Sequence, residues 1–257
     1  MGSDVSRTST ELSVDEVLDR VDWLLEEGEP DKARRLCRRA IRQHGREERL
    51  WIAYGDSLSE GGRFREALKA FERGAELAPS WALAHAKCAE ALLEVGRVEA
   101  AEESVSLALA LDRDDGHASF VRAMVHEFMG RDDLADFWYR RAARLDGDNY
   151  FRPHRTSWER FSAAAGEAVS MLPPQATRAL GGRKLRVREL PSRTSRGLES
   201  ILRMCETVRG TGEEEGPRTY LYRRNIERVC RDRHDLVEQI YLTLLNEYRT
   251  DPRASNS

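Results

Sequence analysis

The sequence has no long apolar run and little cysteine. No stretch of about 18 consecutive apolar residues occurs, so we expect no membrane-spanning helix. The first residues are polar and lack an apolar core, so we expect no secretory signal either. None of the four cysteines stands in a C-x-x-C pair, which favours buried free thiols in a reducing compartment. These absences predict a cytoplasmic protein.

Several signatures of catalysis are also missing. The sequence has no G-x-S-x-G, no P-loop and no dinucleotide-binding fingerprint. No two of the six histidines are three or four positions apart, and only Cys230 and His234 have the i, i+4 spacing of metal ligands. Because no third ligand accompanies them, we interpret the pair as a packed thiol beside a surface histidine. We therefore predict no cofactor and no metal site.

The net charge of −3 conceals two halves of opposite sign. Residues 1–149 hold 22 Lys and Arg against 31 Asp and Glu, a net charge of −9. Residues 150–257 hold 20 against 14, a net charge of +6. This change of sign favours two domains with a boundary near residue 150. The basic residues form no continuous stripe interleaved with aromatics, which argues against a nucleic-acid partner.

A period of 34 residues runs through the first half. Glycine recurs at this spacing, alanine recurs five residues after each glycine, and a third column of small residues follows. The three columns are Gly28, Gly62, Gly96 and Gly130, then Ala33, Ala67, Ala101 and Ala135, then Ala40, Gly74, Ala108 and Ala142. Glycine lets a helix end and the chain turn, and small residues let two helices approach closely. Each unit therefore predicts a helix–turn–helix pair.

This pattern resembles the tetratricopeptide repeat, whose helical hairpins stack into a solenoid that binds other proteins. The aligned units span 14–47, 48–81, 82–115 and 116–149. The second unit keeps the family pattern at Trp51, Tyr54, Gly55, Leu58, Gly62, Ala67, Phe71 and Pro79. The resemblance implies an all-α solenoid of four repeats over residues 14–149, preceded by a flexible tail over 1–13.

In the tetratricopeptide family, positions 9 and 13 of each unit usually point into the concave groove. Here position 9 reads Asp22, Asp56, Glu90 and Met124, and position 13 reads Glu26, Glu60, Glu94 and Phe128. The resemblance therefore implies an acidic partner-binding groove with one apolar end, which would take a protein or peptide with a basic segment. The alternative is a solvated helix face without a partner.

The second half predicts a mixture of helices and strands. Apolar residues at helical spacing predict a helix over 151–172, which Pro173 and Pro174 end. The further expectations are a strand over 183–190, a short helix over 197–208, a loop over 210–217, a strand over 219–222 and a helix over 232–248. Together they predict a small α+β domain over 150–250, followed by a tail over 251–257.

The order of these elements resembles a small bacterial zincin-like metallopeptidase family. The resembling phrases cover residues 161–173, 185–191, 220–227 and 236–247. In that family the last helix ends in H-E-x-x-H, in which two histidines bind zinc and the glutamate activates a water molecule. The matching stretch here runs from Asn246 through Glu247 to Thr250, so Glu247 alone matches the motif.

The loss of both histidines decides the functional prediction. The amide of Asn246 and the hydroxyl of Thr250 are poor zinc ligands, and without zinc nothing activates a water for Glu247. We therefore predict a degenerate zincin-like domain without a catalytic site, and a function as an interaction adaptor or regulatory scaffold. Two alternatives stay open. One is a zinc metallopeptidase with non-standard ligands, and the other is a basic second half that docks on the acidic groove of its own chain or of a second copy.

Overall fold

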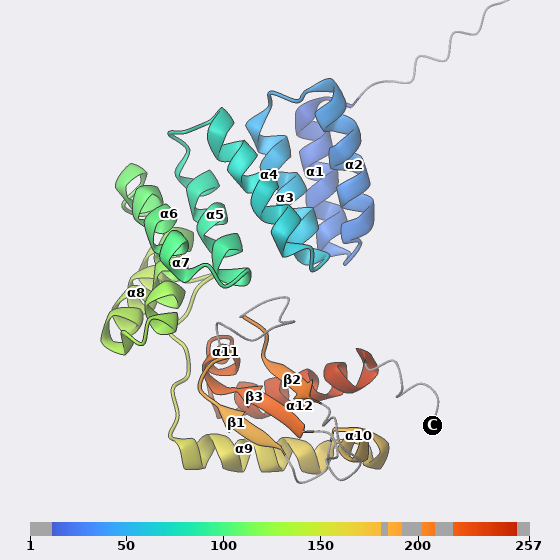
Figure 1. Ribbon diagram of the computed structural model, residues 1–257, viewed down its shortest axis with the longest axis vertical. Helices are drawn as coiled ribbons and strands as arrows, with labels where there is room; N and C mark the ends of the chain where they lie inside the picture. The colour runs from blue at the N-terminus through green and yellow to red at the C-terminus, as the bar shows by residue number, and fades with distance from the viewer. Residues whose placement is uncertain (1–11, 181–184, 192–201, 209–217, 251–257) are drawn as a thin grey trace, which may run out of the picture. The chain divides into compact units, whose positions relative to one another are not determined.

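The structure, a computed structural model, describes residues 12–180, 185–191, 202–208 and 218–250 (Figure 1). The chain forms two compact units. Unit 1 comprises the chain up to Leu92 together with Glu99–Arg113, and unit 2 comprises Leu93–Val98 together with the chain from Asp114 onward. The fourth repeat therefore belongs to the same compact unit as the second half of the chain, whereas the charge changes sign near residue 150.

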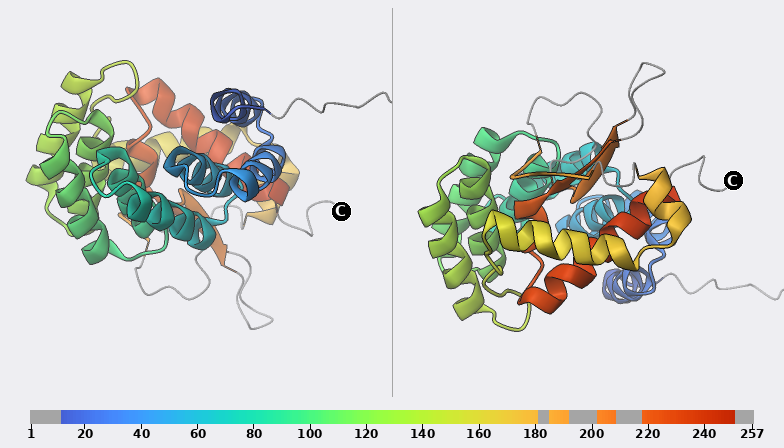
Figure 2. Two further views of the ribbon diagram at one scale, coloured as in Figure 1. Left: turned by 90° about the horizontal axis from the view of Figure 1, so that it is seen from above. Right: turned by 90° about the horizontal axis from the view of Figure 1, so that it is seen from below.

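The repeat half consists of helical hairpins. Its helices are α1 (Val14–Glu26), α2 (Pro30–Gln43), α3 (Glu48–Glu60), α4 (Phe64–Leu77), α5 (Ala82–Glu94), α6 (Val98–Leu111), α7 (Gly116–Phe128) and α8 (Asp132–Leu145). Short turns join the two helices of each hairpin, which run antiparallel (Figures 1 and 2). The predicted helix–turn–helix units are thus confirmed over this continuously described part of the chain.

The glycine column marks the turns of these hairpins. Its four members have φ values between 70° and 78°, a left-handed conformation that glycine adopts without a steric penalty. At the end of α1 the Gly28 amide donates to the Leu25 carbonyl at 3.0 Å, and the Glu29 amide donates to the Leu24 carbonyl at 2.8 Å. These two bonds satisfy carbonyls that the end of a helix would otherwise leave unpaired.

The other small residues lie where paired helices approach each other. The alanine column, Ala33, Ala67, Ala101 and Ala135, is buried throughout. A Cβ added at Gly55 of α3 would overlap the Phe71 ring of α4, and one added at Gly74 would lie 2.7 Å from the Ile52 side chain. Small residues at these positions therefore set how closely α3 and α4 pack.

The second half of the chain forms a small sheet with helices. Its elements are α9 (Trp158–Met171), α10 (Pro174–Ala179), β1 (Arg186–Arg188), β2 (Cys205–Val208), β3 (Arg218–Tyr222), α11 (Arg223–Glu227) and α12 (Arg233–Thr250). In the described sheet β3 lies in the middle, parallel to β1 and antiparallel to β2. Side chains of α9, α12 and the sheet share one core, in which Phe161, Leu221 and Ile240 are fully buried.

Two elements are shorter than the sequence predicts. The helix expected over 151–172 begins at Trp158, because Pro153 disfavours helix before it and the Ser157 side chain caps the helix by accepting from the Arg160 amide at 3.3 Å. Trp158, the first residue of the helix, is 43% exposed. The strand expected over 183–190 is limited to β1 within the described residues.

The helix expected over 197–208 is wrong in its described part. Residues 205–208 form β2, which pairs with β3. Thr207 and Val208 are β-branched and fit a strand better than a helix. Residues 197–201 and the expected loop over 210–217 lie outside the described residues. The strand expected over 219–222 and the final helix are confirmed as β3 and α12.

Candidate partner-binding surface

The predicted acidic positions lie on the first helix of each of the first three hairpins. They are Asp22 and Glu26 on α1, Asp56 and Glu60 on α3, and Glu90 and Glu94 on α5. Asp56, Glu90 and Glu94 are half-buried, and the other three side chains are exposed. The repeat thus presents these carboxylates at its surface without burying any of them fully.

Carboxylates of the same column lie close enough to repel each other. Burial raises the pKa of the Asp22 carboxyl above its ordinary value, and the negative charge of Asp56 raises it further. Asp22 and Asp56 are one repeat apart. So are Asp15 and Arg49, whose side chains form an ion pair of 2.8 Å. Equivalent positions of the first two repeats are therefore neighbours in unit 1, as the 34-residue period predicts.

Lys87 of α5 partly neutralises this acidic surface. Its Nζ lies 2.9 Å from an Asp56 carboxylate oxygen and 4.0 Å from a Glu90 oxygen. Lys87 stands three positions before Glu90, so both side chains lie on one face of α5. This cation was not predicted, although its spacing from position 9 of the third unit could have indicated it.

Met124 and Phe128, the predicted apolar end of the groove, lie inside unit 2. The exposed fraction is 3% for Met124 and 7% for Phe128. The guanidinium of Arg228 lies 5.7 Å from the centre of the Phe128 ring. The carboxylates of the predicted groove therefore lie at the surface, whereas these two apolar side chains belong to the interior of unit 2.

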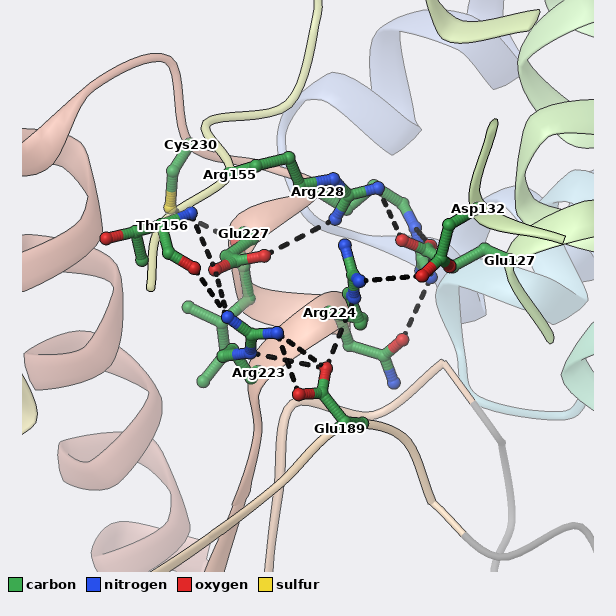
Figure 3. Close-up of polar contacts among 12 residues, drawn as sticks. Glu127, Asp132, Arg155, Thr156, Glu189, Arg223, Arg224, Glu227, Arg228 and Cys230 are labelled. Carbon is green, nitrogen blue, oxygen red and sulfur yellow. Dashed lines mark hydrogen bonds and ion pairs between the residues drawn. The ribbon is translucent and has the colours of Figure 1, made fainter. Parts of the chain in front are cut away.

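A buried ionic cluster joins the fourth hairpin to the second half of the chain (Figure 3). Arg228 donates to a Glu127 carboxylate oxygen at 2.7 Å, and its Nε lies 3.1 Å from the Tyr139 hydroxyl. The Tyr139 hydroxyl donates to the same carboxylate at 3.0 Å, and Arg155 donates to its other oxygen. Glu127, Tyr139 and Arg228 are buried. Three donors from both halves of the chain thus satisfy one buried carboxylate.

Electrostatics fixes the charge state of this carboxylate. Burial favours the neutral form of Glu127, but the charges of Arg228 and Arg155 outweigh burial and hold the pKa of the Glu127 carboxyl below its ordinary value. Burial raises the pKa of the Tyr139 hydroxyl, and the charge of Glu127 adds to this effect. The cluster therefore contains an ionised Glu127–Arg228 pair and a neutral Tyr139.

A second carboxylate of the cluster, Glu227, is compensated less well. It accepts a hydrogen bond of 3.2 Å from the Thr156 amide, whereas Arg155 and Arg223 approach it only to 3.5 Å and 3.6 Å. Arg223 instead donates to the Thr156 carbonyl at 2.5 Å and to Glu189 at 2.7 Å. Burial consequently raises the pKa of the Glu227 carboxyl despite the nearby arginines.

This cluster was not predicted from the sequence. Its members come from α7, α8, α11 and the segment before α9, so no local spacing brings them together. Residues 123–128 of α7 are buried in succession, on all sides of the helix, although His126 and Glu127 are polar. The two polar residues hide this burial from a reading of the sequence alone.

The end of α12, where the resembling family has its zinc ligands, is attached to β2. A Glu247 oxygen accepts a hydrogen bond of 2.7 Å from the Thr207 amide, and the other oxygen lies 3.5 Å from the Cys205 sulfur. Asn246 and Thr250 are exposed, and the Thr250 hydroxyl donates to the Asn246 carbonyl at 3.0 Å. β2 is an edge strand of the described sheet, and its Thr207 amide points away from β3. Glu247 thus accepts a hydrogen bond from an amide that the sheet itself leaves unpaired.

Within the described residues, no three His, Cys, Asp or Glu side chains are arranged to hold a metal ion. The Cys230 thiol is buried and donates to the Ile226 carbonyl at 3.1 Å, whereas His234 is exposed. All four cysteines are free and buried, as predicted. None of the described helices has the length and apolar composition needed to cross a bilayer.

Solved structures with similar folds include several repeat proteins. MamA of Desulfovibrio magneticus RS-1, from residue 41 to its end, is 17% identical, with 52% of this chain and 75% of that chain covered and a TM-score of 0.45. A thermophilic TPR protein of Thermus thermophilus is 18% identical, with coverage of 52% and 75% and a TM-score of 0.48. Another crystal structure of MamA is 16% identical, with coverage of 63% and 85% and a TM-score of 0.44. Likeness at this level says nothing about what this chain binds.

Family models match the repeat half directly. A model described as tetratricopeptide repeat matches residues 24–88 and 58–124, and a second model of the same description matches residues 117–149. No curated protein matches the chain. The matched residues contain the end of α1, all of the helices α2–α8 and the glycine turns between paired helices. Residues 24–149 therefore carry tetratricopeptide repeats.

Proposed function

We propose that this protein is an interaction adaptor that binds a basic segment of another protein on the acidic face of α1, α3 and α5. Stacked helical hairpins expose long faces to partners, and this use of the fold is general. The placement of a pair of incompletely buried carboxylates on each of α1, α3 and α5 carries the proposal, and the charge of Asp56 adds to burial in raising the pKa of the Asp22 carboxyl. A cation placed beside these carboxylates would relieve the repulsion, so the surface favours lysine and arginine.

The Lys87 contact supports the same proposal. Its ammonium group already lies against Asp56 and Glu90, which is the kind of contact that a partner's lysine would make. Asp22, Glu26 and Glu60 are exposed on the same set of helices. The free buried thiols fit a reducing compartment, so we place this adaptor in the cytoplasm.

We infer that the second half is a degenerate zincin-like domain that stabilises the fourth repeat. The order of α9, β1, β3 and α12 follows the order that the resemblance implies. Glu247, the one residue that matches the family motif, is hydrogen-bonded to the Thr207 amide. The ionic cluster supports this stabilising role, because Arg155 and Arg228 of the second half donate to the buried Glu127 carboxylate of α7.

Binding of labelled peptides to the full chain tests the adaptor function. A flexible peptide rich in Lys and Arg should bind, and a copy with Glu at the same positions should not. Asp22→Asn with Asp56→Asn should lower the affinity about tenfold at low salt, and the difference should shrink at high salt because exposed charges are screened.

The matched control removes two exposed carboxylates from the second helices, Glu72→Gln on α4 and Glu103→Gln on α6. It should change the affinity less than about twofold, since these charges are not part of the proposed face. An equal loss in both variants would mean that net charge alone attracts the peptide, and the proposed binding face would be wrong.

A further inference from the structure

Helices α9 and α12 pack against each other in unit 2 (Figure 2, right). A trough lies between them at the surface. Two hollows form it, one of about 280 Å³ and one of about 630 Å³, and Arg233 lines both. On α9 the lining residues are Arg160, Ala163, Glu167 and Met171, a spacing that keeps to one face of the helix. At a rise of about 1.5 Å per residue this face is about 16 Å long, or three helical turns.

The smaller hollow has a basic rim. His154, Arg155, Arg160 and Arg233 line it, and they come from three different segments of the chain. Arg155 is already paired within the ionic cluster. The Arg160 guanidinium is exposed and forms no ion pair with any described residue. This end of the trough therefore favours a carboxylate.

Glu167 and Asp232, two exposed carboxylates near this rim, are already engaged. Glu167 pairs with Arg233 across the trough, with both side chains substantially exposed. Such a pair contributes little to stability, so it can open when a ligand enters. Asp232 accepts the backbone amides of His234 and Asp235 at the start of α12. Neither carboxylate neutralises Arg160.

The larger hollow is mainly apolar. Met171, Val237, Tyr241 and Leu242 line it, together with charged side chains at its edge. Met171 is 57% exposed and Leu242 is 41% exposed. Val237 is buried and Tyr241 is half-buried. A hollow of ligand size with an apolar lining and two exposed apolar side chains marks a binding surface rather than an isolated exposed residue.

We propose that this trough is a second docking site, which takes an acidic amphipathic helix of a partner protein. Apolar side chains of that helix, spaced at i, i+4 and i+7, enter the hollow between Met171 and Leu242. Carboxylates at one of its ends meet Arg160 and His154. The ligand is opposite in charge to the basic segment that we assign to the acidic face of unit 1. One ligand therefore does not fit both sites.

A helical peptide with leucines along one face and glutamates in one terminal turn is the probe, and a copy with lysines in place of the glutamates is its control. The methyl signals of the protein's methionines report binding in NMR spectra of the full chain. The chain has five methionines, of which Met171 lies in the trough and Met124 is buried in α7. The glutamate peptide should shift the Met171 signal to saturation and leave the Met124 signal in place. The lysine peptide should bind about tenfold more weakly.

Variants separate the two ends of the trough. Arg160→Gln should lower the affinity for the glutamate peptide about fivefold and reduce the salt dependence of its binding. Leu242→Ser should lower this affinity about tenfold. Both side chains are exposed, so both variants should fold. Arg144→Gln and Leu134→Ser, at exposed positions of α8, are the matched controls and should leave the affinity unchanged.

Several results would overturn the proposal. A merely sticky apolar surface would bind both peptides, so equal binding of the two contradicts a site selective for charge. No movement of the Met171 signal with either peptide contradicts a docking site of any kind. A Met171 signal that depends on protein concentration without peptide assigns the trough to a second copy. A signal that moves when residues 251–257 are removed assigns it to the chain's own tail.

Discussion

Glu127 and Arg228 are 101 residues apart in the sequence and 2.7 Å apart in the structure, and both are buried. Glu127 lies on α7, the first helix of the fourth hairpin, and Arg228 caps the C-terminal end of α11. A buried ion pair adds little stability compared with an apolar contact of the same size, but removal of one partner leaves an uncompensated charge in the interior. The fourth hairpin and the second half of the chain should therefore unfold together.

Replacement of Arg228 should have a large effect on stability. Arg228→Met leaves the Glu127 carboxylate buried with one arginine fewer, and we expect a loss of about 3–5 kcal/mol in the free energy of unfolding. Urea denaturation of the full chain measures this loss. Arg224→Met is the control, because Arg224 pairs with the more exposed Glu189 and Asp132 at 3.2 Å and 3.1 Å. It should cost less than about 1 kcal/mol, and equal losses would contradict the role of burial.

The two glutamates of the cluster should respond to pH in opposite directions. The pKa of Glu127 is lowered by folding, so this carboxylate stabilises the protein above the ordinary glutamate pKa of about 4.3. That contribution is lost as the pH falls through the lower pKa of the folded state. Glu127→Gln should therefore destabilise the protein most at neutral pH, and the difference from the unmodified protein should shrink in acid.

Glu227→Gln should show the reverse. The pKa of Glu227 is raised by folding, so its contribution is present below about pH 4.3 and is lost as the pH rises through the raised pKa. The glutamine variant does not ionise and escapes this loss, while its amide oxygen can still accept from the Thr156 amide. Its stability relative to the unmodified protein should rise between acid and neutral pH. Urea midpoints measured across this range for both variants check the sign, and parallel curves would contradict it.

Lys87 offers a test of the acidic face that increases binding. Lys87→Met removes the ammonium group that now neutralises Asp56 and Glu90. A basic peptide should then bind several-fold more tightly at low salt, and the pKa of the Asp22 carboxyl should rise further because Asp56 loses its counter-charge. Fluorescence anisotropy measures the affinity, and NMR titration of the carboxyl carbons measures the pKa. Weaker binding after this substitution would show that Lys87 itself contacts the ligand.

Local features of the fold were predictable from the sequence, and long-range ones were not. Gly62 and its equivalents reveal the turns because each requires a left-handed backbone conformation, which is a property of a single residue. The alanine columns report helix packing within one repeat. The Glu127–Arg228 pair depends on how α7 meets α11, and no periodicity links these positions. Strand β2 was missed for a similar reason, because its pairing with β3 outweighs the helical pattern of residues 197–208.

The acidic face falls between these cases. The period placed Asp22 and Asp56 in one column, and their mutual repulsion agrees with that placement. The partner of Asp56 was not predicted, because Lys87 reaches it from a different position of the neighbouring repeat. The positive net charge of the second half could be counted from the sequence. The trough between α9 and α12 could not be predicted, because it depends on how two helices 60 or more positions apart pack together.

Glycine substitutions should separate backbone conformation from packing. At Gly62 a Cβ would touch nothing within 4 Å, so Gly62→Ala should cost only the left-handed strain, about 1–2 kcal/mol. At Gly55 the backbone is helical and the Phe71 ring fills the space, so Gly55→Ala should cost about 1–3 kcal/mol through overpacking. Gly166 in α9 is exposed, with open space around it, and Gly166→Ala should stabilise the protein by about 0.5–1 kcal/mol. Thermal denaturation ranks the three, and a stabilising Gly62→Ala would contradict the turn argument.

Glu247 should act as a structural residue, and its substitutions test both this role and the enzyme alternative. Glu247→Ala leaves the Thr207 amide of β2 without its acceptor, which should lower the free energy of unfolding by about 1 kcal/mol, whereas Glu247→Gln keeps an acceptor oxygen and should lower it less.

Zinc should stay well below one ion per chain in the purified protein, because Asn246 and Thr250 are poor ligands. Basic-peptide binding should be the same in the Glu247→Gln variant and in the unmodified protein, since Glu247 is not part of the acidic face. Stoichiometric zinc, together with peptide cleavage that Glu247→Gln abolishes, would instead identify a metallopeptidase with non-standard ligands. In that case the bond to Thr207 would be a resting contact of a catalytic glutamate.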